Sequence, residues 1–414
     1  MCYTNADFMG KKIINSLGIV ERKVLYAKAV YGEEERKAVL RSMENGWLAP
    51  GPLVRKFEEK IAKLFGKKYG IAVNSGSSAN LLALGSIDIP EGSEVITPAM
   101  TFATTVAPII QNGFIPVFVD CVVGRNTINE DLIMKAISKK SKGIMVPHLI
   151  GGVVDMQKVK KIADKYNLIV IEDSCDTLAP SINGKPTAIY SDVTTTSFYG
   201  SHIITALGMG GMVMTDKREI RDKVMMKRDW GRVGNDGEAF EKRFDVKVNN
   251  IPFDSKFLYG ELGYNLKMNE AAAAFGLAQL ERLPKFLKIR EHNFNTLKNY
   301  FNEYKKWFYL PELFNGAKTN WLAFPLIIRK NAPFNRYNFL QHLENKGIQT
   351  RVIFSGNITR HPAYKKVKYR ISSTLENSDY IMAYGFLLGC NQGLGKKELD
   401  IIINSSEAYL SKYK

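Results

Sequence analysis

The chain has 414 residues, 45% of them apolar, which is enough to bury a substantial core and excludes an intrinsically disordered protein. No run approaches the roughly 18 uninterrupted apolar residues that indicate a membrane span. The formal net charge of +17 suits an anionic small substrate, nucleic acid or an acidic membrane surface, and charge alone does not choose among them.

The first half of the chain alternates between two kinds of pattern. Helical spacing predicts helices over 34–46 and 53–66, and a short apolar strand from 70 then breaks into a turn and a helix at 76. Further strands are predicted to begin at 93, 115, 143 and 168, with helices beginning between them at 102, 129 and 155. This alternation predicts an α/β fold with a mainly parallel sheet and helices on both faces.

The second half of the chain lacks this regular alternation of strands and helices. Strands are predicted from 192 and 211, a helix over 219–229, an irregular polar insertion over 232–250, and a long helix over 268–301 that bends at Pro284. A strand in 319–330 and helices from 335 and 396 then predict a compact α+β unit. We therefore expect an N-terminal extension over 1–30, a large domain over 31–285 and a small C-terminal domain over 286–414.

Three short segments carry residues suited to chemistry. In 74-NSGSSAN, backbone N–H groups and hydroxyls at a strand-to-helix turn suit a phosphate, although a plain helix cap is the commoner explanation. Asp173 ends the strand 168-LIVIED, and ligands of open α/β sheets bind beyond such ends, although it too could cap a helix. In 197-SFYGSHIITALGMGG, Ser197 is followed five residues later by His202 and then by a glycine cluster, a combination that packing alone seldom produces.

The cysteines and the basic residues narrow the classes of partner. Cys2, Cys121, Cys175 and Cys390 lie far apart, so we expect structural thiols in a reducing compartment and no metal site. The first residues lack the apolar core of a secretory signal, so we expect a cytoplasmic protein that binds no membrane. The lysines and arginines alternate with acids along predicted helices, which disfavours nucleic-acid binding.

The three segments, in this order, resemble the sugar aminotransferase family, which uses pyridoxal phosphate on the aspartate-aminotransferase-like fold (fold type I). The resemblance runs from about residue 30 to the C-terminal helix, and it includes 97-TPAMTFATTVAPIIQNGFIPVFVD and 261-ELGYNLKMNEAAAAFGLAQLERLP. It implies that Gly76, Ser77 and Ser78 hold the phosphate, that Phe102 stacks on the cofactor ring, and that Asp173 pairs with the ring nitrogen. It also implies roles near the ring for Asp176 and at the phosphate for Ser197, and a contact to the phosphate from Asn265 of a neighbouring subunit, hence a homodimer with shared active sites.

The chain departs from the family at one position, because His202 stands where the family has its Schiff-base lysine. An imidazole cannot form that covalent link, so ordinary amino transfer is disfavoured. The same replacement occurs in two groups that the chain resembles, the CDP-4-keto-6-deoxyglucose 3-dehydrases and the GDP-4-keto-6-deoxymannose 3-dehydratases. The first group also carries a cysteine-ligated iron–sulfur cluster, and the corresponding insertion here, 232-RVGNDGEAFEKRF, has no cysteine.

The resemblance therefore implies C3 deoxygenation of a nucleotide-diphosphate-linked 4-keto-6-deoxy sugar, without an iron–sulfur cluster. Pyridoxal phosphate and pyridoxamine phosphate would be the two forms of the cofactor, L-glutamate would regenerate the amine, and His202 would move the protons. Arg228, Arg232, Arg351 and Arg360 are candidates for the pyrophosphate, and His148 is expected to be structural or to face the substrate. Three alternatives stay open: an aminotransferase that uses another lysine, a reductase-coupled 3-dehydrase, and an inactive regulator on the same fold.

Overall fold

A computed structural model describes residues 22–233 and 239–414. Its centre is an eight-stranded sheet, with the strands in the spatial order β1 (Tyr69–Val73), β11 (Gly211–Thr215), β10 (Val193–Ser197), β7 (Ile169–Asp173), β6 (Ser141–Pro147), β2 (Glu94–Pro98), β3 (Ile115–Val119) and β18 (Arg370–Ile371). Strand β11 is antiparallel to both of its neighbours, and the other pairs are parallel. The predicted mixed, mainly parallel sheet is confirmed.

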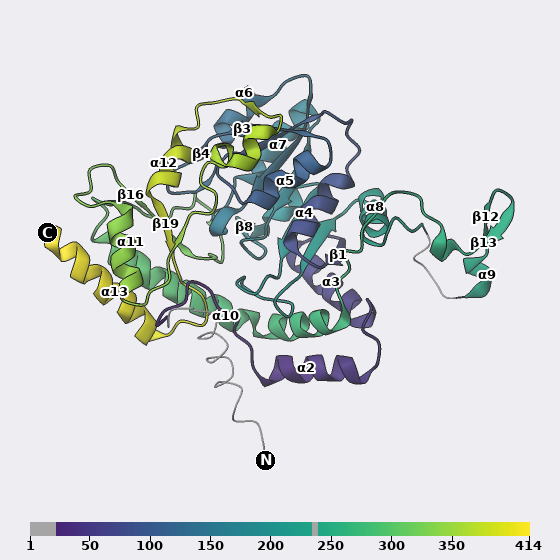
Figure 1. The fold of residues 1–414 in the computed structure, drawn as a ribbon, viewed down its shortest axis with the longest axis horizontal. Helices are drawn as coiled ribbons and strands as arrows, with labels where there is room; N and C mark the ends of the chain where they lie inside the picture. The colour runs from purple at the N-terminus through teal and green to yellow at the C-terminus, as the bar shows by residue number, and fades with distance from the viewer. Residues whose placement is uncertain (1–21, 234–238) are drawn as a thin grey trace, which may run out of the picture.

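Helices cover both faces of this sheet, as Figure 1 shows. Alternate residues of a strand point to opposite faces. In β6, Ile144 and Val146 belong to the apolar cluster on one face of the sheet, whereas Met145 belongs to the cluster on the other face. The helices of this part are α2 (Glu33–Glu44), α3 (Pro52–Phe65), α4 (Gly76–Gly85), α5 (Ala103–Gln111), α6 (Ile133–Ala136), α7 (Met156–Tyr166) and α8 (Arg218–Arg228).

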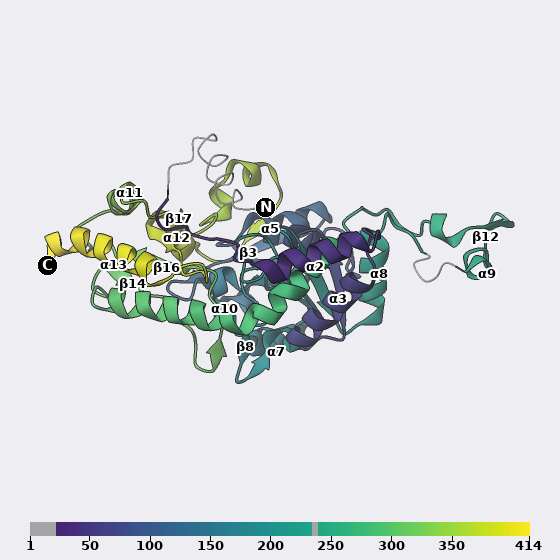
Figure 2. The ribbon, with the colours of Figure 1, turned by 90° about the horizontal axis from the view of Figure 1, so that it is seen from below.

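The C-terminal part is built on a second sheet and one long helix. The sheet has the order β14 (Phe308–Tyr309), β16 (Phe324–Ile328), β19 (Gly385–Leu388) and β17 (Arg351–Val352). It packs with α10 (Glu270–Asn302), α11 (Arg336–Asn345), α12 (Glu376–Tyr384) and α13 (Lys396–Leu410). Figure 2 shows α13 beside the C-terminal half of α10. No helix within 22–233 or 239–414 has the length and apolarity needed to cross a membrane.

The two parts of the chain are closely joined. Helix α10 continues through Pro284, so the expected boundary at 285/286 falls inside one helix. Strand β18, from the C-terminal part, pairs with β3 in the large sheet. At the other end, Val24 bridges Ile348, so the described residues of the expected N-terminal extension lie on the C-terminal part. Residues 1–21 of that extension lie outside the described residues, and the division into domains stays a prediction.

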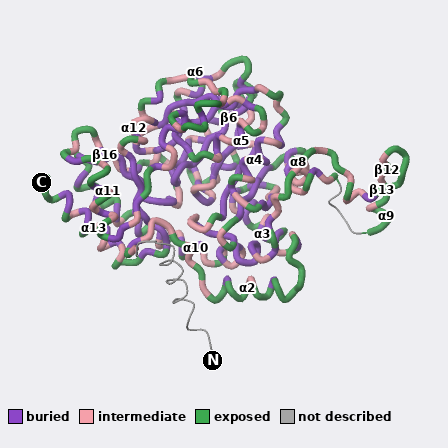
Figure 3. The backbone as a smooth tube through the Cα atoms, viewed as in Figure 1, coloured by how far each residue is buried: buried purple, intermediate pink, exposed green. Residues whose placement is uncertain are grey.

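The insertion that follows α8 forms an arm that projects from the body of the molecule in both ribbon views (Figures 1 and 2). It contains α9 (Phe240–Arg243) and a hairpin of β12 (Val246–Val248) and β13 (Ile251–Phe253). The prediction of an irregular segment over 232–250 is wrong for the part that the structure describes, because α9 and β12 lie within it. The arm also exposes apolar side chains, since those of Phe240 and Ile251 are 65% and 64% exposed. Figure 3 contrasts this exposed arm with the buried centre. Residues 234–238 lie outside the described residues.

The remaining strands form one two-stranded and one three-stranded sheet, both short. They are β4 (Cys121–Val122) with β5 (Thr127–Ile128), and β8 (Ser181–Ile182) with β9 (Lys185–Pro186) and β15 (Ala317–Lys318). The helix expected from residue 129 is shorter than predicted, a single 3-10 turn leading into α6.

Candidate active site

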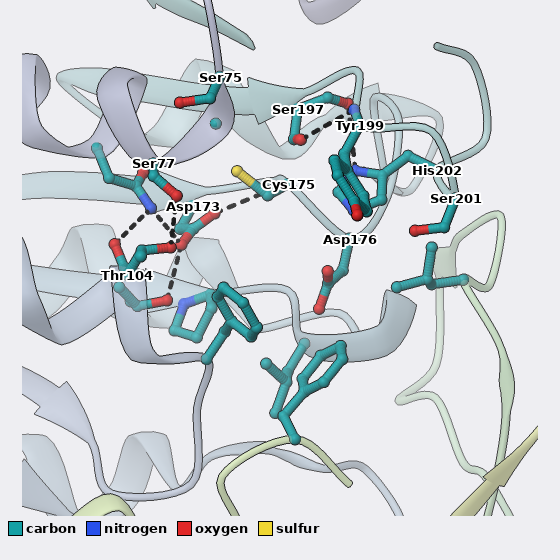
Figure 4. A pocket seen from close by; sticks show the side chains of 18 of the residues that line it. Ser75, Ser77, Thr104, Asp173, Cys175, Asp176, Ser197, Tyr199, Ser201 and His202 are labelled. Atoms are coloured by element: carbon teal, nitrogen blue, oxygen red, sulfur yellow. Dashed lines mark hydrogen bonds between the residues drawn. The ribbon is translucent and has the colours of Figure 1, made fainter. Parts of the chain in front are cut away.

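A cavity of about 460 Å³ opens at the edge of the large sheet where β6, β7 and β10 end and where β1 leads into α4. Ligands of α/β sheets bind at this edge, and the size suits a small organic ligand. Figure 4 shows side chains from these segments converging on it. The predicted cofactor-binding and catalytic residues that line the cavity are Gly76, Ser77, Phe102, Asp173, Asp176, Ser197 and His202.

The start of α4 forms one wall of the cavity. Ser75 caps the helix, because its hydroxyl accepts a hydrogen bond from the Ser78 backbone N–H at 3.1 Å. The Ser78 hydroxyl donates to Asn74 at 2.7 Å, and Ser78 does not line the cavity. Among the described residues, nothing accepts a hydrogen bond from the N–H groups of Gly76 and Ser77. The helix-cap interpretation is therefore confirmed at Ser75. The remaining N–H donors suit an anion, and their role at a phosphate stays a prediction.

Gly76 is held against the strand that carries Ser197. A Cβ atom at Gly76 would lie 2.7 Å from the Ser197 Cβ and 2.9 Å from the Cys175 sulfur, which is closer than packed atoms come. Only glycine therefore lets α4 begin this close to the end of β10.

We expect Gly76→Ala to lower the free energy of unfolding by about 1–3 kcal/mol, because the new methyl group must displace the Ser197 and Cys175 side chains. Urea unfolding would measure this. Gly200→Ala is the matched control, since its Cβ would meet nothing nearer than 3.6 Å. Equal stabilities of the two variants would contradict the close packing described above.

Asp173 lies at the base of the cavity and is 4% exposed. Its carboxylate accepts hydrogen bonds from Asn80 Nδ2 and Thr105 Oγ1, both at 2.8 Å, and from the Cys175 N–H at 3.1 Å. These donors stabilise a buried negative charge. The site thus presents a fixed carboxylate that a protonated ring nitrogen can pair with.

Phe102 and Phe354 form an aromatic corner of the cavity. Their ring centroids are 5.4 Å apart in an edge-to-face arrangement, and the Phe102 side chain remains 48% exposed. A half-exposed aromatic face beside a buried carboxylate suits a flat, heteroaromatic ligand.

His202 lies in the loop between β10 and β11 and faces the cavity beside Tyr199 (Figure 4). Its Nδ1 is 3.3 Å from the Ser197 carbonyl oxygen, to which it donates. No described residue forms a hydrogen bond with Nε2, which is therefore the ring atom able to accept a proton. Burial lowers the pKa of His202 to about 4; the Ser197 hydrogen bond opposes this shift, and the charge of Arg290 adds to it. The imidazole is thus neutral, and a proton acceptor, at pH 7.

Asp176 is the second carboxyl group of the cavity. The Ile150 N–H donates to it at 2.8 Å. Burial raises the pKa of Asp176 to about 7; the Ile150 hydrogen bond opposes the rise, and the neighbouring Asp173 adds to it. A carboxyl group with this pKa can hold or release a proton near neutral pH.

The raised pKa of Asp176 predicts a pH-dependent stability. Because the folded protein binds this proton more tightly than the unfolded chain does, the free energy of unfolding falls as the pH rises from 3.8 to about 7. We expect Asp176→Asn to stabilise the cofactor-free protein by about 1–3 kcal/mol at pH 8 and by less at pH 5. Urea unfolding at both pH values, with Asp164→Asn on an exposed helix face as the control, would measure this. An equal gain at both pH values would contradict the assignment.

His148 lines the cavity but is held by the protein. Its Nδ1 accepts a hydrogen bond from the Val154 N–H at 3.1 Å, so Nε2 carries the proton and donates to Glu172 at 2.9 Å. Burial opposes ionisation of Glu172, but hydrogen bonds from His148 and Thr187 lower its pKa below the usual value. Both ring nitrogens of His148 therefore have protein partners, and the ring has a structural role in the cavity wall.

None of the four arginines singled out in the sequence lines the cavity within this chain. Arg228 binds Glu58 at 2.9 Å and the Ala72 carbonyl oxygen at 2.8 Å. Arg232 lies over the Trp230 ring at 4.5 Å, and Arg360 pairs with Asp379.

Arg351 is nearer to the cavity, since its guanidinium lies 5.8 Å from the ring centroid of Tyr26, a lining residue. Asn265 is exposed, bridges Asp229 and does not line the cavity of its own chain.

The structure adds residues that sequence reasoning did not find. Tyr26, from the expected N-terminal extension, lines the cavity because Asn391 holds its carbonyl oxygen at 3.1 Å. Asn80 and Thr105 also line it and bind Asp173. Asn80 lies one helical turn after Ser77, a spacing that could have pointed to it; nothing near Tyr26 in the sequence could have.

Comparison with known proteins then assigns the family. Residues 30–407 match the DegT/DnrJ/EryC1/StrS aminotransferase family. The chain belongs to this family. It is a pyridoxal-phosphate-dependent enzyme of the sugar aminotransferase type, and the relatives it is most similar to include nucleotide-sugar 3-dehydratases.

Two relatives and one solved structure show how similar the chain is to known proteins. The chain is 38% identical to the lipopolysaccharide biosynthesis protein RfbH of Salmonella typhimurium, covering 92% of this chain and 90% of that one. It is 35% identical to the dTDP-4-dehydro-2,6-dideoxy-D-glucose 3-dehydratase of Saccharopolyspora spinosa, with 93% and 86% covered. The structure of the Escherichia coli GDP-4-keto-6-deoxy-D-mannose 3-dehydratase with bound hydrated PLP matches with a TM-score of 0.86 at 26% identity, with 93% and 100% covered. The predicted fold type I architecture is confirmed.

The cavity residues fit pyridoxal phosphate. The free N–H groups at the start of α4 suit the phosphate, the Asp173 carboxylate suits the ring nitrogen, and the exposed face of Phe102 suits the ring. No lysine of the described residues lines the cavity, so a covalent link from this chain's own wall has no donor there.

Proposed function

We propose that the protein removes the C3 hydroxyl group of a nucleotide-diphosphate-linked 4-keto-6-deoxy sugar and releases a 3-deoxy-4-keto sugar. The observation that carries this proposal is His202, half-buried in a cavity that no described lysine lines, with its Nε2 free to accept a proton. The likeness to nucleotide-sugar 3-dehydratases at 30–35% identity supports it.

When bound, the cofactor accepts electrons into its ring and carries an amino group to the sugar ketone. His202 takes a proton from the cofactor's C4′ carbon and then donates one to the departing C3 oxygen. A single imidazole can serve both steps because it is neutral at rest and becomes a strong acid once protonated. Asp173 keeps the ring nitrogen protonated throughout, since Asn80 and Thr105 fix its carboxylate.

The overall reaction balances with glutamate as the second substrate. The C3 oxygen leaves as water, and glutamate supplies the two electrons of the deoxygenation as it is oxidised to 2-oxoglutarate, with its nitrogen released as ammonia. No iron–sulfur cluster is required for this balance. A solved neighbour carries a trapped PLP-glutamate geminal diamine, which supports glutamate as the donor.

The pyrophosphate of the substrate needs cationic partners. Arg351 is the first candidate, because it contacts Tyr26 at the cavity wall, whereas Arg228, Arg232 and Arg360 have partners elsewhere in the chain.

We also propose a homodimer in which Asn265 completes the phosphate site of the partner. Asn265 is exposed, and the arm beside it exposes Leu262 by 94% and Trp230 by 39%, apolar surface of the kind that subunit contacts bury. Light scattering would test the dimer. Activity regained on mixing inactive His202→Asn and Asn265→Ala subunits would test the sharing.

The test of the function is one incubation with product analysis. CDP-, GDP- and dTDP-linked 4-keto-6-deoxyhexoses are incubated with the protein, pyridoxal phosphate and L-glutamate. The masses of the products are measured by mass spectrometry. We expect a 3-deoxy sugar that has lost one oxygen and contains no added nitrogen, formed with an equal amount of 2-oxoglutarate. Nitrogen retained on the sugar would instead identify an aminotransferase, and turnover only with an added reductase would identify a reductase-coupled 3-dehydrase.

A further inference from the structure

Arg290, in the middle of α10, is a buried cation without a counter-charge. It is 1% exposed. Its guanidinium donates to the Trp321 carbonyl oxygen at 2.7 and 3.2 Å, to the Leu322 carbonyl oxygen at 2.8 Å and to the amide oxygen of Gln392. No carboxylate among the described residues pairs with it. Burying a charge without a counter-charge lowers the stability of a protein. We therefore expect the charge of Arg290 to have a functional role that a neutral side chain could not take.

One set of hydrogen bonds joins Arg290 to the segment of His202. Gln392, whose oxygen Arg290 holds, donates through Nε2 to the Ile203 carbonyl oxygen at 3.1 Å. Ile203 is the residue after His202. The side chain of Gln392 therefore connects α10 directly to the backbone beside the imidazole.

A second set leads to Asp176. The Leu322 carbonyl oxygen is held by Arg290, and the Leu322 N–H donates to the Ile150 carbonyl oxygen at 2.9 Å. Ile150, in turn, donates to Asp176 at 2.8 Å. Ile150 has a φ of 60°, which is unfavourable for a β-branched residue, so the surrounding hydrogen bonds must hold it there.

We propose that Arg290 is a positioning residue of this active site, which fixes through Gln392 and Leu322 the two segments that carry His202 and Asp176 and supplies an uncompensated positive charge to them. The inference rests on the proposed function only for the catalytic importance of His202. The placement and charge of Arg290 stand apart from it.

The electrostatics agree with this geometry. The groups around the His202 ring are Tyr199, with a centroid distance of 6.0 Å, the Ser197 carbonyl oxygen, and the lining residues Tyr26 and Asp176. After burial, the charge of Arg290 is the further influence that lowers the pKa of His202. A positive charge nearby opposes the gain of a second one, so it keeps the imidazole ready to accept a proton from the substrate side.

The test separates the charge of Arg290 from its hydrogen bonds. Gln392→Glu pairs Arg290 with a carboxylate, which cancels the charge, and it also removes the N–H donor to the Ile203 carbonyl oxygen, as Gln392→Met does, so the difference between the two variants reports the charge. Gln392→Met breaks the link to Ile203 and leaves the charge in place. The pKa of His202 is measured by NMR of the imidazole carbons in the full-length, cofactor-free protein, with its signal among the five histidines assigned by its loss in His202→Asn.

We expect Gln392→Glu to raise the pKa of His202 by about one unit, and Gln392→Met to leave that pKa nearly unchanged while lowering kcat more than it raises KM. Arg290→Met should raise the pKa in the same direction as Gln392→Glu. If Gln392→Glu folds and leaves the His202 pKa unchanged, the inference is overturned, whether or not Arg290→Met folds. A raised pKa in a protein that deoxygenates no sugar would refute the proposed function and leave the inference standing.

Discussion

Replacing His202 with asparagine is expected to lower the rate of C3 deoxygenation by about 10²–10⁴-fold, the usual contribution of a general acid–base group. Asparagine keeps a side chain that can bond to the Ser197 carbonyl oxygen, but it cannot take up a proton. Since the other cavity contacts remain, pyridoxal phosphate should bind with nearly unchanged affinity. Product formation in a single turnover measures the rate, and absorbance titration measures the binding.

The control for this variant is His292→Asn, on the exposed face of α10 and outside the cavity. It should retain full activity. If His202→Asn deoxygenates the sugar at the wild-type rate, another group moves the protons and the role assigned to His202 is wrong.

Replacing Asp173 with asparagine has the second largest expected effect. The carboxylate is buried, is fixed by Asn80 and Thr105, and suits a protonated ring nitrogen. Asparagine removes the charge that favours that proton, so the ring becomes a poorer electron acceptor. We expect the rate to fall by about 10²–10³-fold, a loss typical of removing one electrostatic partner from an active site.

The absorbance of the bound cofactor would check this loss independently, because it reports the protonation of the ring. Thr105→Val is a graded comparison, since it removes one of the two side-chain donors to Asp173 and keeps the carboxylate. It should give a smaller loss than Asp173→Asn. Equal losses would mean that the packing around Asp173, and not its charge, carries the effect.

The sequence predicted the parts of the fold whose pattern is local. The strands that end at Asp173 and Ser197 and the turn at Gly76 could be placed because parallel strands bring their carboxyl ends to one edge of a sheet. The meeting of these segments in one cavity follows from the same rule. Helix α9 and strand β12 were not predicted, because the lysines, aspartates and glycines of 232–250 are typical of an irregular loop.

The remaining site residues depend on contacts between distant segments. Tyr26 is held by Asn391, 365 positions away, and Arg290 by Gln392, 102 positions away. No local spacing in the sequence indicates such contacts. The arginines that bind the pyrophosphate could not be identified from the sequence either. Nothing in the local sequence shows that Arg228 and Arg360 form ion pairs, and only the structure pairs them with Glu58 and Asp379.

In the proposed function an imidazole, and no lysine, serves the cofactor in this cavity. Borohydride reduction of the protein loaded with pyridoxal phosphate, followed by measurement of the intact mass, distinguishes the two. We predict that the wild-type protein keeps its unmodified mass, whereas His202→Lys gains the mass of one phosphopyridoxyl group (the cofactor plus two hydrogens minus water) and so shows that the reduction works. A cofactor fixed to a lysine of the wild-type protein would show that the role proposed for His202 is wrong.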